Sequence, residues 1–281
     1  MSISQNDLER RVVEMANLPT LPGILLKIVN MTEGPESGAA EVATLIATDQ
    51  VLSAKVLRLV NSPIYGFPGR ISSITHAVVL LGFNVVKGLV LGTAVFDTIG
   101  SEGRALWNHS LGCAVISRHL ATVAKVPDPE EVMIAGLLHD LGKVALAYVA
   151  PGHYAQAVME SRKKGCHIGE VEREVFGVTH SRVGGWLCNE WHFPARLSDP
   201  LMYHHNPERA KAGAEVAAVI HVSDILARCM GYGDPGDNSM PALQKGILES
   251  LGVTMEQLDT VLQDAELDYV AGASTLETDT A

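Results

Sequence analysis

The segment Gly136-Leu137-Leu138-His139-Asp140-Leu141-Gly142-Lys143 places a histidine and an aspartate side by side at the end of an apolar helical run. Imidazole and carboxylate ligands together suit Fe, Mn, Zn or Co better than Ca or Mg. Because a carboxylate has two oxygens, Asp140 can bridge two ions while His139 serves as a terminal ligand on the same helical turn. The segment therefore predicts a helix that contributes two ligands to a metal site inside a helical bundle.

Further residues of the same types follow in a suggestive order along the chain. They come from four other segments and are His109, His180, His204, His205 and Asp224. A single histidine on a helix is usually a packed or surface residue, and Asp224 alone could simply pair with Arg228 one turn later. The joint order His, His-Asp, His, His-His, Asp is what predicts two divalent transition-metal ions, Fe, Mn or Zn, held by these residues. Two such ions roughly 3.5–4 Å apart can hold a hydroxide and polarise a phosphoryl oxygen.

Helical periodicity extends through most of the chain. Val42, Leu45 and Ile46 repeat at the spacing of one helical face, and no alternating β-branched run bounded by hairpin turns is present. The sequence Asp128-Pro129-Glu130-Glu131 predicts a capped helix start, and Thr254 with Gln257 predicts a capping box. We therefore predict an all-α, multi-helical bundle with an N-terminal helical subdomain.

Changes in composition suggest how the chain is organised. Residues 1–100 are expected to form the N-terminal helical part, and residues 101–235 a helical bundle that carries the candidate ligands. Residues 236–270 predict C-terminal helices, and the small, polar and acidic residues 271–281 predict a disordered tail. Within the apolar stretch 76–96, Gly82 followed by Asn84 indicates that one helix ends and another is capped there. Two helices are therefore favoured over a single membrane span.

Charge and cysteine usage narrow the partners and the compartment. The chain has 281 residues and a formal net charge of −11, so its surface repels phosphate backbones and no nucleic-acid partner is expected. Its four cysteines form no CxxC pair and are typical of reduced thiols in the cytosol. The polar N-terminus lacks a signal-peptide core. We expect a cytoplasmic protein without a membrane partner.

Longer motifs in both halves carry a family resemblance. In the first half they are Leu-Pro-Thr-Leu-Pro at 18–22, Asp-Gln-Val-Leu at 49–52, Val-Asn-Ser-Pro-Ile-Tyr at 60–65, Ile-Thr-His-Ala at 74–77 and Leu-Leu-Gly at 80–82. In the second half they are Glu-Val-Phe-Gly-Val-Thr-His at 174–180, Trp-His-Phe-Pro at 191–194 and His-His at 204–205. Over roughly residues 10–230 the chain resembles the HDOD family, bacterial relatives of the HD superfamily of metal-dependent phosphohydrolases. The resemblance implies an HD-superfamily bundle with a regulatory or scaffolding role in signalling.

The candidate ligands also resemble those of the HD-GYP branch, which hydrolyses cyclic di-GMP. Lys143 follows His139 by four residues, as in that branch's His-Asp-Ile-Gly-Lys motif, with Leu141 here in place of Ile. The resemblance implies catalytic roles for Asp140 and Lys143, with Lys143 reaching a substrate phosphate.

Two departures from the HD-GYP pattern argue against cyclic di-GMP as the substrate. Asn206-Pro207-Glu208 follows the histidine pair where that branch has its Gly-Tyr-Pro loop, and Gly231-Tyr232-Gly233-Asp234-Pro235 comes too late, after Asp224. Ala105 stands where trinuclear sites of that branch have a glutamate, so a third metal is not expected.

Two functions remain open at this stage. The HDOD resemblance and the missing substrate loop predict a signalling module that binds a partner protein without turnover. The metal ligands and Lys143 instead predict an active phosphohydrolase acting on a nucleotide or another phosphoester. The alternative for the ligand set itself is a degenerate site without metal, but each buried polar group left unpaired there would cost about 1–3 kcal/mol.

Some neighbouring residues receive weaker predictions. Glu174 is expected to support the site or to be structural, and His221 either to support the ligands or to lie at the surface. His167 has no ligand-like context beyond the family pattern.

Overall fold

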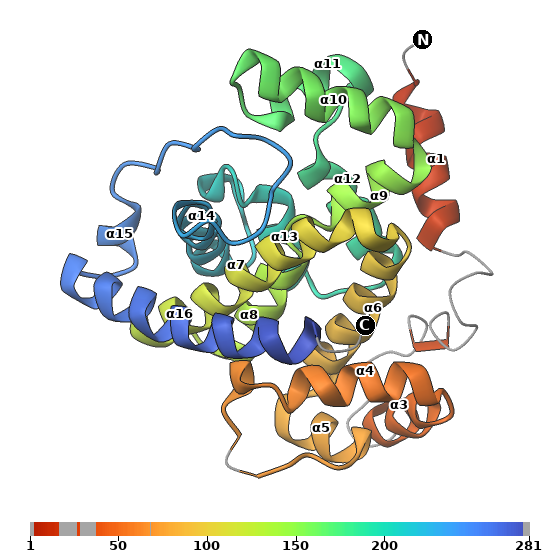
Figure 1. Cartoon of the computed structure of the whole chain (residues 1–281), viewed down its shortest axis with the longest axis vertical. Helices are drawn as coiled ribbons and strands as arrows, with labels where there is room; N and C mark the ends of the chain where they lie inside the picture. Colours follow the sequence, from red (N-terminus) through yellow and green to blue (C-terminus); the bar gives the residue numbers. More distant parts are fainter. Residues whose placement is uncertain (1–2, 17–26, 29–37, 68, 278–281) are drawn as a thin grey trace.

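The computed structural model describes residues 3–16, 27–28, 38–67 and 69–277, and within these ranges every regular element is a helix (Figure 1). The predicted all-α, multi-helical class is therefore confirmed. The Leu-Pro-Thr-Leu-Pro motif at 18–22 lies outside the described residues.

The first helices of the N-terminal part form a layer at the bottom of Figure 1, and its last long helix rises from there into the rest of the molecule. The elements of this part are α3 (Gly38–Ala47), α4 (Gln50–Val60), η1 (Pro63–Tyr65), α5 (Ile74–Leu81), α6 (Phe83–Asp97) and η2 (Gly100–Gly103). α3 and α4 both pack against α5. Two of these helices begin at side-chain caps, because Asp49 accepts a hydrogen bond from the Leu52 N–H and Ser73 accepts one from the His76 N–H.

Gly82 separates α5 from α6. Its φ of +84° is a backbone conformation that residues with a Cβ rarely adopt, so the chain turns there instead of continuing as one long helix. The expected division of the stretch 76–96 into two helices is confirmed. Asn84 does not act as the cap, since its side-chain amide donates to Glu131 Oε1 at 3.1 Å.

The second half of the chain forms the larger body of helices. Its elements are α7 (Arg104–Val123), α8 (Pro129–Leu138), α9 (Leu141–Val149), α10 (Pro151–Lys164), α11 (Ile168–Phe176), α12 (His180–Glu190), α13 (Ala195–Tyr203), η3 (Pro207–Arg209), α14 (Ala214–Cys229) and α15 (Ile247–Ser250). α7 packs against α8 and α14, and α12 packs against α9 and α13. α6 contacts α8 and α9 and so joins the two halves.

The N-terminal helix packs on the second half of the chain, and the C-terminal helix contacts both halves. The N-terminal helix α1 (Gln5–Ala16) packs on α9 and α12, far from α3–α5 in Figure 1. The C-terminal helix α16 (Met255–Glu277) lies along α7 and also contacts η1 and α4. α16 continues through residues 271–277, which we expected to be a disordered tail; residues 278–281 lie outside the described part of the chain.

One segment is long and apolar enough to cross a membrane by length and composition. It runs from Pro129 to Val149, and 83% of its most apolar window is buried inside the protein. The turn at His139 and Asp140 divides it into α8 and α9. It therefore has the burial of a pair of core helices in a globular domain.

The two predicted helix starts in the second half differ in outcome. Thr254 and Gln257 form the expected capping box, with each side chain accepting a hydrogen bond from the other's backbone N–H. Asp128 stands at the start of α8 but has a φ of +56° and caps nothing. Its carboxylate instead accepts a hydrogen bond from Arg196 at 2.8 Å, which ties this end of α8 to α13.

Candidate metal centre

The residues predicted as metal ligands converge inside the second half of the chain. α7 supplies His109, the turn between α8 and α9 supplies His139 and Asp140, the first residue of α12 is His180, the end of α13 is followed by His204 and His205, and α14 supplies Asp224. Potential ligand atoms of all these residues fall into three overlapping clusters, each compact enough to surround one ion. All are buried except His205, whose side chain is 17% exposed.

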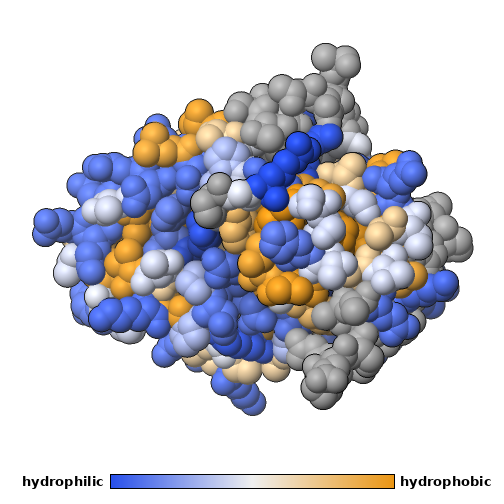
Figure 2. Space-filling model, turned by 90° about the horizontal axis from the view of Figure 1, so that it is seen from below, coloured by the Kyte–Doolittle hydropathy of each residue, from blue (hydrophilic) through white to orange (hydrophobic). Residues whose placement is uncertain are grey.

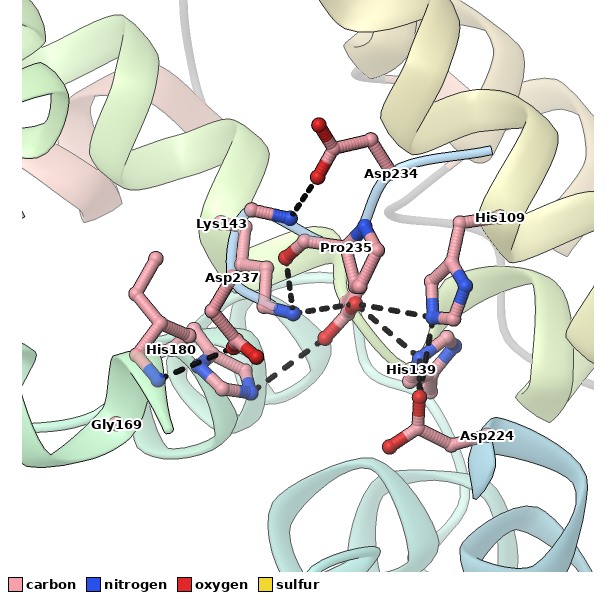
Figure 3. Close-up of polar contacts among 12 residues, drawn as sticks. His109, His139, Lys143, Gly169, His180, Asp224, Asp234, Pro235 and Asp237 are labelled. Carbon is pink, nitrogen blue, oxygen red and sulfur yellow. Dashed lines mark hydrogen bonds and ion pairs between the residues drawn. The ribbon is translucent and has the colours of Figure 1, made fainter. Parts of the chain in front are cut away.

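Asp140 lies between two groups of imidazole nitrogens. Its Oδ2 is 3.2 Å from His139 Nε2 and 3.8 Å from His109 Nε2. Its Oδ1 faces the other way, 3.4 Å from His180 Nε2 and 4.0 Å from His204 Nε2. Figure 3 shows His109 and His139 together on one side of the site and His180 on the opposite side. This is the placement that a carboxylate bridging two ions requires.

Hydrogen bonds at the outer nitrogens orient three of the rings. Nδ1 of His139 is 2.7 Å from the Gly136 carbonyl, and Nδ1 of His204 is 2.7 Å from the Leu201 carbonyl. A carbonyl only accepts, so in both rings Nδ1 carries the proton and Nε2 faces inward. In His180 the same position is taken by Glu172, whose Oε2 is 2.7 Å from Nδ1. Such outer partners are usual for histidines that bind metals.

The inward-facing atoms provide a direct test of whether a metal fits. Nε2 of His139, Nε2 of His204 and Oδ1 of Asp140 are buried and have no hydrogen-bond partner. Each unpaired acceptor would cost about 1–3 kcal/mol if nothing bound it. Divalent cations bound on the two sides of Asp140 would satisfy all three atoms, so the donor set fits metal.

Asp224 closes the opposite side of the cluster. Its Oδ1 lies 3.1 Å from His109 Nε2 and its Oδ2 lies 4.0 Å from His205 Nδ1. Arg228, one turn later on α14, donates to the same Oδ1 at 3.0 Å. Burial raises the pKa of Asp224, but Arg228 and His109 outweigh burial and hold this pKa well below its usual range. The carboxylate is therefore ionised and able to bind a cation.

Burial acts in the opposite direction on several histidines. It lowers the pKa values of His204 and His205 well below the usual range for histidine, and the neighbouring imidazoles lower them further. Burial likewise lowers the pKa of His109. Neutral rings keep the lone pairs that metal coordination needs.

Lys143 has a different environment from the one its motif implied. It is fully buried, and its ammonium donates to Asp140 Oδ2 at 2.7 Å and to the Pro235 carbonyl at 2.9 Å (Figure 3). Lys143 therefore holds the bridging carboxylate and the segment around Pro235, and it does not project into open space where a substrate phosphate would bind.

Glu172 is the main site residue that the sequence analysis missed. It is fully buried, and one of its oxygens accepts a hydrogen bond from the His180 backbone N–H at 2.8 Å as well as contacting Nδ1. Glu174, which we expected to support the site or to be structural, is exposed and pairs with Lys164. The helical period contained the signal, because Glu172 falls on the buried face of α11 between Ile168 and Phe176.

Glu172→Gln is expected to weaken metal binding by about 10- to 100-fold, because the amide cannot offer His180 the same charged acceptor. Metal titration of the chelator-treated protein, read by calorimetry, measures this change. Glu174→Gln, two residues along the same helix, is the matched control and should leave the affinity unchanged. Equal losses in both variants would show that α11 responds to any change in charge and that Glu172 has no specific role.

The segment after α14 covers the cluster from the side of α7. Gly233 lies very close to α7. A Cβ added to it would fall 2.2 Å from the Ala105 carbonyl oxygen and 2.3 Å from the backbone nitrogen of His109. Asp237 accepts hydrogen bonds from the Ile168 N–H and from Arg228. The segment Gly231-Tyr232-Gly233-Asp234-Pro235 therefore packs on α7 beside Ala105, whose carbonyl accepts a hydrogen bond from the Asp234 N–H.

His221 supports the ligands from behind. It is 4% exposed, its Nδ1 is 2.9 Å from the His204 carbonyl, and its Nε2 accepts a hydrogen bond from the Gln244 N–H. Of the two expectations for His221, the supporting position is the one observed.

The geometry agrees with comparisons to known proteins. The HDOD domain model matches residues 18–207, more than half of the chain, and the protein therefore belongs to the HDOD family. A curated protein of Treponema pallidum (strain Nichols), described as uncharacterized, is 23% identical over 91% of this chain. That alignment covers 50% of the relative, so this chain spans about half its length.

Two crystal structures share the fold over nearly the whole chain. An HDOD domain protein of unknown function from Geobacter sulfurreducens has a TM-score of 0.71 and 27% identity, covering 98% of this chain and 99% of that one. A protein of Shewanella amazonensis SB2B, named as a candidate phosphohydrolase, has a TM-score of 0.71 and 22% identity. The match covers 95% of this chain and 98% of that one. At this identity the second likeness shows the fold alone.

Proposed function

We propose that this chain is a bacterial, cytoplasmic HDOD signalling module whose HD-like half holds a dinuclear transition-metal centre. The observation that carries the metal proposal is the set of buried, unpartnered acceptors on His139, His204 and Asp140. Four cysteines without a disulfide support a reducing compartment.

Each proposed ion has its own set of ligands around the shared Asp140. His109, His139 and Asp224 would complete one position, and His180, His204 and His205 would complete the other. Nitrogen-rich ligand sets with carboxylates favour Fe, Mn or Zn. Bound metals would supply a hydroxide and polarise a phosphoryl oxygen.

Elemental analysis of protein purified without a chelating tag tests the metal proposal. We expect about two equivalents of Fe, Mn or Zn per chain, as a dinuclear site requires. Less than about a tenth of an equivalent after both aerobic and anaerobic purification would rule out a resident dinuclear centre with these ligands.

The second candidate function is a metal-dependent phosphohydrolase acting on a nucleotide or another phosphoester. The pairing of Lys143 with Asp140 favours regulation over catalysis, because that ammonium is not free to meet a substrate. A broad phosphoester screen with fully metal-loaded protein separates the two functions. Turnover that Asp140→Ala abolishes would support the enzyme, and no turnover would support the signalling module.

A protein partner would find an apolar surface on the N-terminal layer. Val51 on α4 and Val79 and Leu80 on α5 are 67%, 76% and 48% exposed. Figure 2 views the molecule from this side and shows an apolar patch bordered by hydrophilic residues. We propose that a signalling protein binds here, since apolar surface of this kind marks interaction sites. A specific partner captured by the wild type and by Met159→Glu on α10, but lost with Val79→Glu, would support this surface.

A further inference from the structure

The second ion position opens into a pocket of about 840 Å³. His180 and His205 lie at its inner end, and its walls come from α11, α12 and the segment around η3. Pockets that bind small ligands have volumes of this order. The pocket thus gives a small molecule access to the candidate metal centre.

Positive charge gathers around this pocket although the chain as a whole carries −11. The lining includes four cations, Arg173, Arg182, Arg209 and Lys211, and one carboxylate, Glu208. Arg173, Arg209 and Lys211 are exposed, and within the described part of the chain none of their side chains forms an ion pair. Such a concentration of unpaired cations attracts anionic ligands.

His167 adds a buried hydrogen-bond donor beside the ion position. Its ring meets the ring of His205 edge-on, with the centroids 4.5 Å apart, and it also lines the pocket. Its Nδ1 accepts a hydrogen bond from the Gly169 backbone N–H at 3.2 Å, so this nitrogen carries no proton. In a neutral imidazole the proton must then be on Nε2, which is buried and has no partner.

The tautomer of His167 distinguishes it from the metal ligands around it. His204 is protonated on Nδ1 and presents an unprotonated Nε2 to the cluster, whereas His167 presents an N–H. An N–H cannot coordinate a metal, but it can donate to an oxygen that is bound beside the metal.

We propose that this pocket binds a phosphorylated ligand carrying a second, separate anionic group. One phosphoryl group lies at the ion position and accepts a hydrogen bond from His167 Nε2, and the second anionic group lies against Arg173 and Arg209. This inference rests on the proposed metal centre and specifies the ligand class of that same site. In this arrangement His167 is a positioning residue and the two arginines determine specificity.

Calorimetric titration of the full-length, metal-loaded protein with two nucleotides tests this assignment. Adenosine 5′-monophosphate has one phosphate, and adenosine 3′,5′-bisphosphate has a second one placed apart from the first. We expect the bisphosphate to bind at least about tenfold more tightly, the gain from one or two additional charge-assisted hydrogen bonds. Arg173→Gln with Arg209→Gln should abolish this preference, and Arg70→Gln, an exposed arginine outside the pocket, should preserve it.

The variant His167→Asn tests the proposed hydrogen bond from His167 Nε2 to the phosphoryl group separately. Asparagine retains an acceptor for the Gly169 N–H at the start of α11 but is too short to place a donor where Nε2 lies. Binding of both nucleotides should weaken by about tenfold, while metal content and melting temperature stay at wild-type values. Unchanged nucleotide affinity in this variant would remove His167 from the assignment.

The metal content of the same samples separates failure of this inference from failure of the metal proposal. Two bound equivalents with equal affinity for the two nucleotides, or with no nucleotide binding, would overturn the pocket assignment and leave the metal centre standing. Wild-type protein without metal would overturn the metal centre, and the preference for the bisphosphate would still decide the role of the arginines.

Discussion

Asp140→Ala is expected to remove nearly all bound metal, to below about a tenth of an equivalent, because both ion positions lose their shared ligand. Among the described residues, the same change leaves the buried Lys143 ammonium with the Pro235 carbonyl as its one remaining acceptor. Removing one partner of a buried ion pair costs about 3–5 kcal/mol, so the melting temperature should fall as well. Elemental analysis and thermal unfolding measure the two effects.

A second substitution separates metal loss from destabilisation. Asp140→Ala combined with Lys143→Met removes the unpaired charge and should recover much of the lost stability, since an apolar side chain can replace a buried ion pair. Metal content should remain at the level of the single variant. Lys164→Ala breaks an ion pair with Glu174 in which both side chains are more than 40% exposed, and it should change neither quantity measurably. Metal retained at wild-type level in Asp140→Ala would contradict the bridging role.

The convergence of the candidate ligands was predictable from the sequence because residue type and order contain it. His109 and Asp224 are separated by more than a hundred residues, yet their nitrogen and oxygen atoms lie 3.1 Å apart. The partners that orient the ligands were less predictable. Glu172 and Glu174 have the same side chain two positions apart, and the one that meets His180 is on the face of α11 that packs on the core, which the helical period indicates.

Helices were predictable, but their assembly was not. Local signals such as the Gly82 break depend on neighbouring residues in the sequence and were recovered. The packing of α1 on α12, or of α16 along α7, depends on contacts between residues far apart in the chain, which no local period reports. The segment around Gly233 is another case, because only the close approach to α7 shows why a glycine stands there.

Gly142 packs closely against α12 beside the candidate metal centre, and Gly142→Ala is expected to be severely destabilising. An added Cβ would lie 1.9 Å from the His180 carbonyl oxygen and 2.7 Å from the Gly184 nitrogen. Both are backbone atoms of α12, so no side-chain rotation can relieve the overlap. Overpacking usually costs about 1–3 kcal/mol, and with rigid backbone on both sides we expect the upper end or more.

The position of this contact links stability to metal binding. α9 begins directly after Asp140, and α12 begins at His180. Forcing these two helices apart moves the histidine away from the bridging carboxylate, which it approaches to 3.4 Å. Gly142→Ala protein that still folds should therefore lose metal from the position that includes His180 first.

Gly152→Ala is the matched control for Gly142→Ala. Gly152 also lies in a helix, α10, but nothing stands within 4 Å of where its Cβ would be. Alanine is favoured over glycine in helices by up to about 1 kcal/mol, so this variant should be as stable as the wild type or slightly more stable. Thermal unfolding of both variants with metal analysis gives the comparison. If Gly142→Ala melted and bound metal like Gly152→Ala, the close packing of α9 on α12 would not be what places His180 at the site.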